Sequence, residues 1–286
     1  MNNIDTFPLP CRAPSQIAVA APESGSQRWA GAPTALLDDR AGTLLAYRVR
    51  NGVGDRVVLA RSDDAVHFAT ITEVTARGLG VPMVERAALV PMPTGWRLYM
   101  SCAEPGTKAW WLGLLESRRI EDLPDAALRR LELGGPLEAL KDPIIRRRGD
   151  RWEAWVCCHP LDIPGAEDRM STIYATSDDG IDWRYHGTVL TGRAGQWDAR
   201  GARLTSVLPD GRAYYDGRAT AEENWFERTG LAVPTGNGAA LRALDGEPVA
   251  DIRYLEVLAL PSGGHRLYYE ARRPDGAHEL RTELHR

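Results

Sequence analysis

Arginine and carboxylate side chains occur at corresponding places along this sequence, next to segments whose pattern predicts strands. Those at the start of a predicted strand are Glu85, Arg86, Asp142, Asp198, Arg203 and Arg253. Those at the end of the strand that follows are Arg48, Asp216, Arg218, Glu270 and Arg272, together with His159. Arginine binds a carboxylate or a phosphate through two parallel hydrogen bonds, so this set predicts a pocket for an anionic substrate or inorganic phosphate. The alternative is that each arginine neutralises a neighbouring carboxylate and braces the fold.

These residues share positions because the sequence repeats a strand–turn–strand phrase. The five copies begin near Ala32, Glu85, Asp142, Asp198 and Tyr254, at a spacing of roughly fifty residues that is typical of propeller blades. One blade cannot bury both faces of its sheet, so the copies must stack around an axis. The predicted fold class is all-β, a single five-bladed β-propeller over residues 1–286 with a central pocket. Residues 17–21 are expected to complete the last blade, because pairing of the two termini removes exposed edges.

A second phrase marks equivalent turns in two blades. Residues 62–68 and 177–183 are near copies with the pattern Ser-Asp-Asp, three further residues and an aromatic. The Ser and Asp side chains can cap such a turn, and the aromatic ring can pack between sheets, so we interpret the phrase as structural. The one helical pattern covers residues 122–130.

Composition excludes several classes of function. The net charge is −4 with no block of like charge, which argues against nucleic acid or a membrane surface as a partner. The four cysteines are expected to be reduced and buried, and the chain begins without a basic segment that leads into an apolar core, so we expect a cytoplasmic location. Zinc-type spacings and phosphate-loop motifs are missing, so neither a metal nor a cofactor is predicted.

Three phrases resemble the five-bladed propeller glycosidases, the group that includes glycoside hydrolase families 43, 32 and 130. The first is Lys141-Asp142-Pro143, followed by an apolar strand and Gly149-Asp150. The second joins the turn at residues 177–183 to the segment 186–190. The third is Trp197-Asp198, followed by residues 214–218 and 228–232. The likeness covers essentially the whole chain and implies a propeller in which acidic residues from different blades meet in the central pocket.

The resemblance assigns roles to two aspartates. In these families one carboxylic acid protonates the leaving oxygen, and another carboxylate attacks the sugar or activates water. Asp142 matches the aspartate of the third blade that stabilises the transition state or tunes the acid. Asp198 aligns with the general acid of the fourth blade, although the families usually carry Glu there. The shorter side chain shifts the carboxyl group by about one carbon–carbon bond, which matters at catalytic distances.

The sequence departs from the families in the first blade. Ala32 and Pro33 stand where the families have an essential aspartate, and the nearby Asp38 and Asp39 are interpreted as turn residues. Three explanations are open: Glu85 takes the place of the missing base, phosphate acts as the nucleophile without a protein base, or hydrolysis has been lost.

Several further residues are candidates for substrate binding. Arg86, Arg203 and Arg253 would hold substrate or phosphate. His159 could act as a general acid or base, could bind phosphate, or could simply end a strand. Trp110 could stack on a sugar ring or pack between sheets.

The sequence therefore predicts a carbohydrate-active enzyme, a glycoside hydrolase or glycoside phosphorylase acting on a small sugar. Asp198, Asp142 and Glu85 are the predicted catalytic residues. The alternative is a non-hydrolytic sugar-binding or repurposed propeller whose arginine-rich pocket binds an anionic metabolite.

Overall fold

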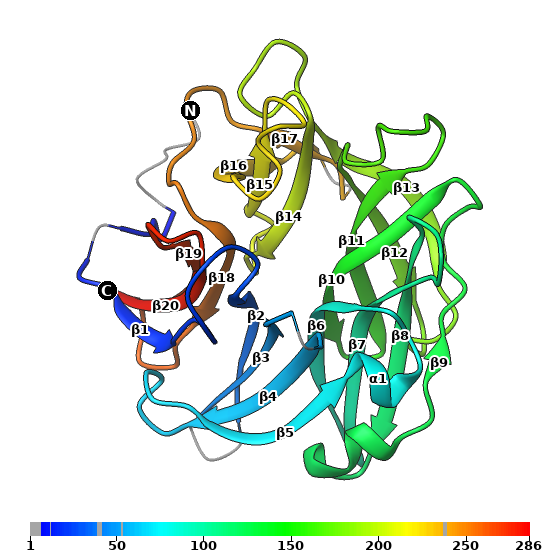
Figure 1. Cartoon of the computed structure of the whole chain (residues 1–286), viewed down its shortest axis with the longest axis vertical. Coiled ribbons are helices and arrows are strands. Elements are labelled where there is room, and N and C mark those ends of the chain that lie inside the picture. The colour runs from blue at the N-terminus through cyan, green and yellow to red at the C-terminus, as the bar shows by residue number, and fades with distance from the viewer. Residues whose placement is uncertain (1–6, 12, 39–41, 53, 237–238) are drawn as a thin grey trace.

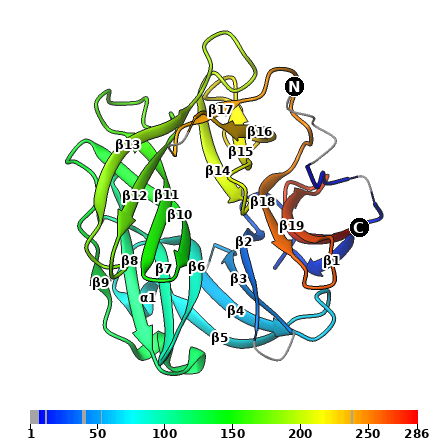
Figure 2. The same cartoon turned by 180° about the vertical axis from the view of Figure 1, so that it is seen from behind.

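The fold is a five-bladed β-propeller. The computed structural model describes residues 7–11, 13–38, 42–52, 54–236 and 239–286. Figure 1 shows its antiparallel blades arranged around a central axis, and Figure 2 shows them from behind. The first strand of every blade lies next to the axis, so residues near the starts of these strands can meet there.

Blades two, three and four are separate four-stranded sheets whose strands follow one another in chain order. Their strands are β6 (Val84–Met92), β7 (Gly95–Ala103), β8 (Trp110–Ser117), β9 (Arg129–Arg130), β10 (Glu138–Arg148), β11 (Arg151–Pro160), β12 (Ser171–Ser177), β13 (Arg184–Thr191), β14 (Gly201–Val207), β15 (Ala213–Arg218), β16 (Arg228–Pro234) and β17 (Leu241–Ala243).

Blades one and five are joined into one larger sheet by a parallel pairing of Trp29 with His278. The strands involved are β2 (Trp29–Leu37), β3 (Thr43–Arg50), β4 (Arg56–Ser62), β5 (Ala69–Thr75), β18 (Arg253–Ala259), β19 (His265–Arg272) and β20 (His278–His285). The strand β1 (Gln16–Val19) pairs antiparallel with β20 and becomes the outer strand of blade five. The first and last strands of the chain therefore lie side by side in one blade.

Apolar side chains hold neighbouring blades together. Successive residues of a strand point to opposite faces, so the inner strands contribute to the clusters on both sides of their blade. The described residues form five buried clusters, one in each space between adjacent blades. Between blades five and one, Tyr268 and Leu280 pack with Leu45 and Val58. The space between the last blade and the first is therefore packed as the other four are.

A bulge recurs near the start of the first strand in four blades. In β2, β6, β10 and β18 two residues lie opposite one residue of the second strand. These bulges begin at Ala32, Glu85, Asp142 and Tyr254. Ala32, Asp142 and Tyr254 have φ angles of 50°, 55° and 52°, a left-handed conformation that costs energy in residues other than glycine. The repeated bulge bends each strand at the axis.

Blade four differs from the others. Its first strand β14 begins at Gly201, and the irregularity in its pairing lies at Thr205. Asp198, which the sequence places at the start of this blade, therefore lies in the turn before the strand. Arg203 pairs with Asp216 across β14 and β15, as Arg253 pairs with Glu270 in blade five.

The two Ser-Asp-Asp turns have the same hydrogen bonds. The Oδ1 atom of Asp64 accepts from the Ser62 hydroxyl at 2.8 Å and from two backbone N–H groups further along the turn. Asp179 does the same in blade three, with the Ser177 hydroxyl at 2.9 Å. The structural interpretation of this phrase is confirmed.

The first hairpin turn also contains an aspartate with a capping role. The Asp38 carboxylate accepts from the backbone N–H of Gly42 at 2.7 Å and from Arg61 at 2.6 Å. Asp38 is therefore a turn residue, as expected. Asp39, for which the same role is expected, lies outside the described residues.

Helices are short in the described part of the chain. The single turn α1 (Ala76–Leu79) follows blade one, and its first turn is capped by the hydroxyl of Thr75. The expected helix over residues 122–130 is a 3₁₀ helix, η2 (Ile120–Asp125), and Arg129 and Arg130 belong to β9 instead. The expectation was wrong in extent because Pro124 has no N–H to continue an α-helix. Neither described helix has the length and apolar character that crossing a membrane would need.

Candidate functional site

Two adjoining cavities open at the end of the axis where the first strands begin. The deeper one, the axial cavity, has a volume of about 60 Å³. The outer one, the entrance cleft, has a volume of about 330 Å³. The residues that line both are Arg50, Glu85, Lys141, His159, Arg218, Asn224 and Trp225.

Buried ion pairs surround the axis next to the axial cavity, and we call them the ion-pair layer. Its arginines and carboxylates are Arg48, Arg203, Arg218, Arg253, Glu85, Asp142, Asp216, Glu227 and Glu270. Arg48 pairs with Glu85 and lies 2.9 Å from Glu270. Arg253 lies 2.7 Å from Glu270 and 2.6 Å from Glu227.

The other two arginines of the layer also pair with two carboxylates each. Arg203 lies 2.6 Å from Asp216 and 3.1 Å from Asp142. Arg218 pairs with Glu227 and lies 3.5 Å from Asp168. All four arginines of the layer therefore brace the propeller, which is the alternative that the sequence left open.

The layer keeps its glutamates ionised. Burial opposes ionisation of Glu85, but the guanidinium groups of Arg48 and Arg50 outweigh burial and hold the pKa of Glu85 below its ordinary range. The same balance between burial and arginine lowers the pKa of Glu270 and brings that of Glu227 to about 2. A carboxylate held in this form accepts hydrogen bonds but cannot protonate a leaving group.

Asp142 is fully buried in the layer. Its Oδ2 atom accepts from Arg203 at 3.1 Å and from the Tyr254 hydroxyl at 3.2 Å, and its backbone N–H donates to Ser101 at 2.8 Å. Its Oδ1 atom has no hydrogen-bond partner among the described residues. Lys141 brings its Nζ atom to 4.0 Å from Oδ2. Asp142 is thus placed on the axis, as expected, but behind the residues that line the two cavities.

Asp198 is not brought to these cavities. Its carboxylate is fully buried, accepts from the Tyr215 hydroxyl at 2.7 Å and pairs with Arg193 at 2.9 Å. Arg193 in turn donates to the backbone of Leu244, on the outer side of blade four. Asp198 does not line the axial cavity or the entrance cleft. Its surroundings indicate a structural role.

Arg86 and Arg272 also lie away from the entrance cleft. Arg86 faces the far end of the axis, where it donates to the backbone of Thr205 at 2.6 Å and to Glu256 at 2.9 Å. Arg272 pairs with Asp251 at 3.1 Å. Arg48, Arg203 and Arg253 line the axial cavity, and Glu85, Arg218 and His159 line both cavities. Asp216 and Glu270 lie behind them in the ion-pair layer.

His159 lines both cavities with a neutral ring. Its Nδ1 atom lies 2.9 Å from the backbone oxygen of Glu167. Because that oxygen only accepts, Nδ1 carries the proton and Nε2 is left with a lone pair. Nε2 is buried and has no partner among the described residues. Burial and the neighbouring Lys141 charge lower the pKa of His159 to about 3, so the ring is neutral at physiological pH.

Indole rings line the same cleft. Trp110 lies at the start of β8, and its ring is covered on one side by the Lys141 ammonium at 4.7 Å. Trp225 lies in the loop between β15 and β16 and is 37% exposed, and its ring centre lies 5.4 Å from that of Trp29 in an edge-to-face arrangement. Trp110 therefore lies in the wall of the cleft, and its stacking on a sugar ring stays a prediction.

Two of the residues that line the axial cavity or the entrance cleft were not identified from the sequence. Glu227 is buried between Arg218 and Arg253, although the two residues before it, Trp225 and Phe226, are exposed. Lys108 lines the cleft from the loop between β7 and β8. One signal could have identified it, because Lys108 and Lys141 are the two lysines of the chain.

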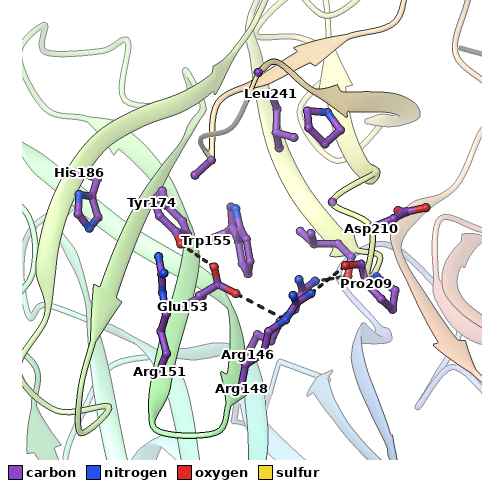
Figure 3. Close-up of a pocket in the computed structure, with 15 residues that line it drawn as sticks. Arg146, Arg148, Arg151, Glu153, Trp155, Tyr174, His186, Pro209, Asp210 and Leu241 are labelled. Carbon is purple, nitrogen blue, oxygen red and sulfur yellow. Dashed lines mark hydrogen bonds and ion pairs between the residues drawn. The ribbon is translucent and has the colours of Figure 1, made fainter.

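A third cavity, of about 610 Å³, lies between blades three and four away from the axis (Figure 3). Arg146 and Arg148 extend from β10 to the turn after β14, where Arg148 donates to the carbonyl of Pro209 at 2.8 Å. Glu153 accepts from the Tyr174 hydroxyl at 2.7 Å. These side chains link the two blades, and we assign no ligand to this cavity. The described residues contain no group of three or more His, Cys, Asp or Glu that could hold a metal ion.

No family model and no curated protein matches the chain. Solved structures do match. A thermostable family-43 glycoside hydrolase aligns at 14% identity over 94% of this chain and 92% of its own, with a TM-score of 0.67. The β-1,2-mannobiose phosphorylase from Listeria innocua, in complex with β-1,2-mannobiose, aligns at 14% identity over 92% and 90%, with a TM-score of 0.64.

A family-32 β-fructofuranosidase from Bombyx mori aligns at 13% identity over 97% of this chain and 63% of its own, with a TM-score of 0.63. These matches confirm the expected likeness to the propellers of glycosidases and glycoside phosphorylases at the level of the fold. At such identities the likeness carries the fold alone, because one fold supports many functions.

Proposed function

We propose that the entrance cleft binds a small sugar that carries an anionic group, and that the protein does not hydrolyse glycosidic bonds. The fold is shared with proteins whose names describe action on sugars, one of them in complex with a disaccharide. This kinship supports a carbohydrate ligand, and the side chains of the cleft support its anionic character.

The placement of the two lysines carries the proposal. Lys108 and Lys141 stand among 35 lysine and arginine residues, and both line the entrance cleft. An ammonium group is a compact charge with three donors, unlike the planar arginine fork that braces the layer below. The nearest described carboxylate oxygen to the Lys141 ammonium is 4.0 Å away, which is beyond hydrogen-bond distance. This ammonium is therefore free to bind an anion.

The rest of the cleft suits a sugar ring. Trp110 and Trp225 present indole surface, on which the C–H groups of a sugar can pack. The bare Nε2 atom of His159 can accept a hydrogen bond from a sugar hydroxyl. Asn224, which lines both cavities, offers an amide to another hydroxyl.

The carboxyl groups that line the cleft in the described part of the chain are held in the ionised form. The backbone N–H of Gly165 and the side chain of Arg200 lower the pKa values of Glu167 and Asp168, and that of Glu85 is also lowered. His159 is neutral, with its proton held on Nδ1 by the Glu167 carbonyl. Hydrolysis needs a carboxylic acid that remains protonated near neutral pH. The first blade contributes Ala32 where the resemblance would place a carboxylate.

Calorimetric titration tests the proposal. Glucose 6-phosphate and glucuronate should bind, and neutral β-1,2-mannobiose should bind at least about tenfold more weakly. Lys141→Gln should weaken binding of the anionic sugars by a similar factor, while Arg28→Gln, on the surface, should have no effect. Equal affinity for charged and neutral sugars would overturn the anionic assignment. Release of sugar from aryl glycosides in phosphate-free buffer would overturn the absence of hydrolysis.

A second candidate is a glycoside phosphorylase, and the free lysine ammonium favours it because inorganic phosphate is one anion that it could hold. A phosphate oxygen would attack the anomeric carbon, the glycosidic C–O bond would break, and the proton of dihydrogen phosphate would pass to the leaving alcohol. This reaction requires neither a protein base nor the missing aspartate of blade one. Formation of a sugar 1-phosphate only when phosphate and a disaccharide are both present would establish it.

A further inference from the structure

A second cavity lies on the axis at the end opposite the entrance cleft, and we call it the base cavity. It has a volume of about 600 Å³. Its walls come from the later parts of the first strands of blades one, two, three and five. The axial cavity lies near the starts of the same strands. The lining residues that the argument uses are Thr34, Arg86, Leu89, Val90, Ile144 and Glu256. The ion-pair layer lies between the two ends of the axis.

The base cavity contains a buried cation that is only partly satisfied. Arg86 is 1% exposed. Its Nη2 atom donates to the Thr205 carbonyl at 2.6 Å and to Glu256 at 2.9 Å. Its Nε and Nη1 atoms are buried and have no partner among the described residues, and neither has the hydroxyl of Thr34. Buried donors without partners are costly and rare, so these groups indicate a missing acceptor.

Glu256 compensates the Arg86 charge incompletely. Burial raises the pKa of Glu256 to about 7, and Arg86 only partly opposes the rise. Near neutral pH a large fraction of Glu256 is therefore protonated, and the Arg86 charge is then unbalanced. The other charged side chains that line the cavity are Arg146 and Arg147, and Arg146 donates to the backbone of Val207 and Leu208.

The remaining wall is apolar. Leu89 and Val90 are buried, Ile144 is partly buried, and Pro91 and Ile145 belong to the same lining. A cavity of this size, lined mostly by apolar groups with a few convergent polar ones, has the character of a small-molecule site. The single buried cation suits a singly charged head group, and the apolar wall suits a hydrocarbon body.

We propose that the base cavity binds a small monocarboxylate with an apolar body, its carboxylate on Arg86 and its body against Leu89, Val90 and Ile144. A doubly charged phosphate is disfavoured, because it would lie beside the Glu256 carboxyl group, and Arg86 is the one fully buried arginine among the described lining residues. The proposal does not depend on the sugar site, because no residue lines both the base cavity and the entrance cleft.

Titration of the full chain with octanoate tests the site, with octanamide as the neutral isostere. Octanoate should bind, and octanamide should bind at least about tenfold more weakly. Because the negative charge of Glu256 opposes the ligand, octanoate should bind more tightly at pH 6 than at pH 8. Lys141→Gln in the entrance cleft should leave octanoate binding unchanged. The test of the base cavity can therefore fail or succeed independently of the test of sugar binding.

Two variants locate the ligand. Arg86→Met alone leaves Glu256 buried without its partner, so the paired change Arg86→Met with Glu256→Gln is the better variant, because replacing both partners is far less destabilising. It should retain a cooperative melting transition and lose octanoate binding. Ile144→Phe, which adds volume at a partly buried position of the wall, should weaken binding by about tenfold or more. Absence of octanoate binding to the wild type, equal affinity for octanamide, or full binding by either variant would overturn the proposal.

Discussion

The ammonium of Lys141 lies 4.7 Å from the centre of the Trp110 ring, over its face. A contact of this kind contributes about 0.5–2 kcal/mol. It also orders a side chain that loses considerable rotamer entropy when it is fixed. Trp110 therefore has two roles in the proposed site, because it offers surface to the sugar and holds in place the charge that binds the anion.

Replacement of Trp110 separates these roles. Trp110→Ala should weaken binding of an anionic sugar by about tenfold, because both the ring and the fixed position of Lys141 are lost. Trp110→Phe should recover part of the loss. The matched control is Trp111→Phe, since Trp111 packs instead with the apolar cluster between blades one and two. Calorimetry gives the affinities, and an equal loss in the Trp111 variant would contradict the assignment.

The ion-pair layer should be critical for stability. Arg48→Met removes the charge shared by Glu85 and Glu270 and leaves both carboxylates buried, so the free energy of unfolding should fall by about 3–5 kcal/mol. Arg28→Met breaks an exposed pair with Glu23 and should cost less than about 1 kcal/mol. Urea denaturation measures both. A small effect at Arg48 would show that the layer is not needed for folding.

Stability should also depend on acid pH. Burial opposes the ionisation of Glu85, Glu227 and Glu270, but their arginine partners lower the pKa of all three below that of an unfolded glutamate. The stabilisation is present in full above the unfolded pKa of about 4.3 and is lost as the pH falls through the folded values. Melting temperatures should therefore decrease steeply below about pH 4. A profile that stays flat there would contradict the ion-paired state of these residues.

Asp198→Asn tests whether this residue acts in the cleft. Because the Asp198 carboxylate contacts Tyr215 and Arg193, the change should lower the free energy of unfolding by about 1–3 kcal/mol and leave sugar binding unchanged. Denaturation and calorimetry on the same preparation give both values. Loss of binding or turnover with unaltered stability would restore the general-acid role that the resemblance implies.

His159 should not titrate near neutral pH. Burial and the charge of Lys141 lower its pKa to about 3, so the neutral ring with its proton on Nδ1 should persist throughout the physiological range. Nitrogen chemical shifts of the imidazole, followed by NMR as the pH changes, report both the tautomer and the pKa. His67 is exposed and provides the internal comparison. A titration step of His159 near pH 6.5 would contradict the buried neutral state.

The fold could be predicted because each blade repeats the same residue types at its turn and at the start of its first strand. Ala32, Glu85, Asp142 and Tyr254, which mark four of the repeated phrases, each begin a bulge at the axis. The fourth copy was misplaced, because the pair Trp197-Asp198 has the residue types of a strand start but lies in the preceding turn. Local sequence does not distinguish an acid at the axis from one that is buried in a neighbouring turn.

The site was harder to predict for a different physical reason. The sequence identifies charged residues near the axis. Ion pairing decides which of them remain free for a ligand, and it depends on how the strands are brought together in the fold. Arg48 and Arg203 are committed to carboxylates of other strands, whereas Lys141 is not. Arg86 follows Glu85 directly, yet the two side chains serve opposite ends of the axis.

The rim of the entrance cleft comes from equivalent loops of three blades. Lys108, Glu167 and Trp225 each lie between the second and third strands of their blade, outside the sheets. Such loops tolerate insertion and exchange far better than paired strands do. The loops of one blade could therefore be exchanged to change the ligand preference. The ion-pair layer and the apolar clusters between blades would not need to change.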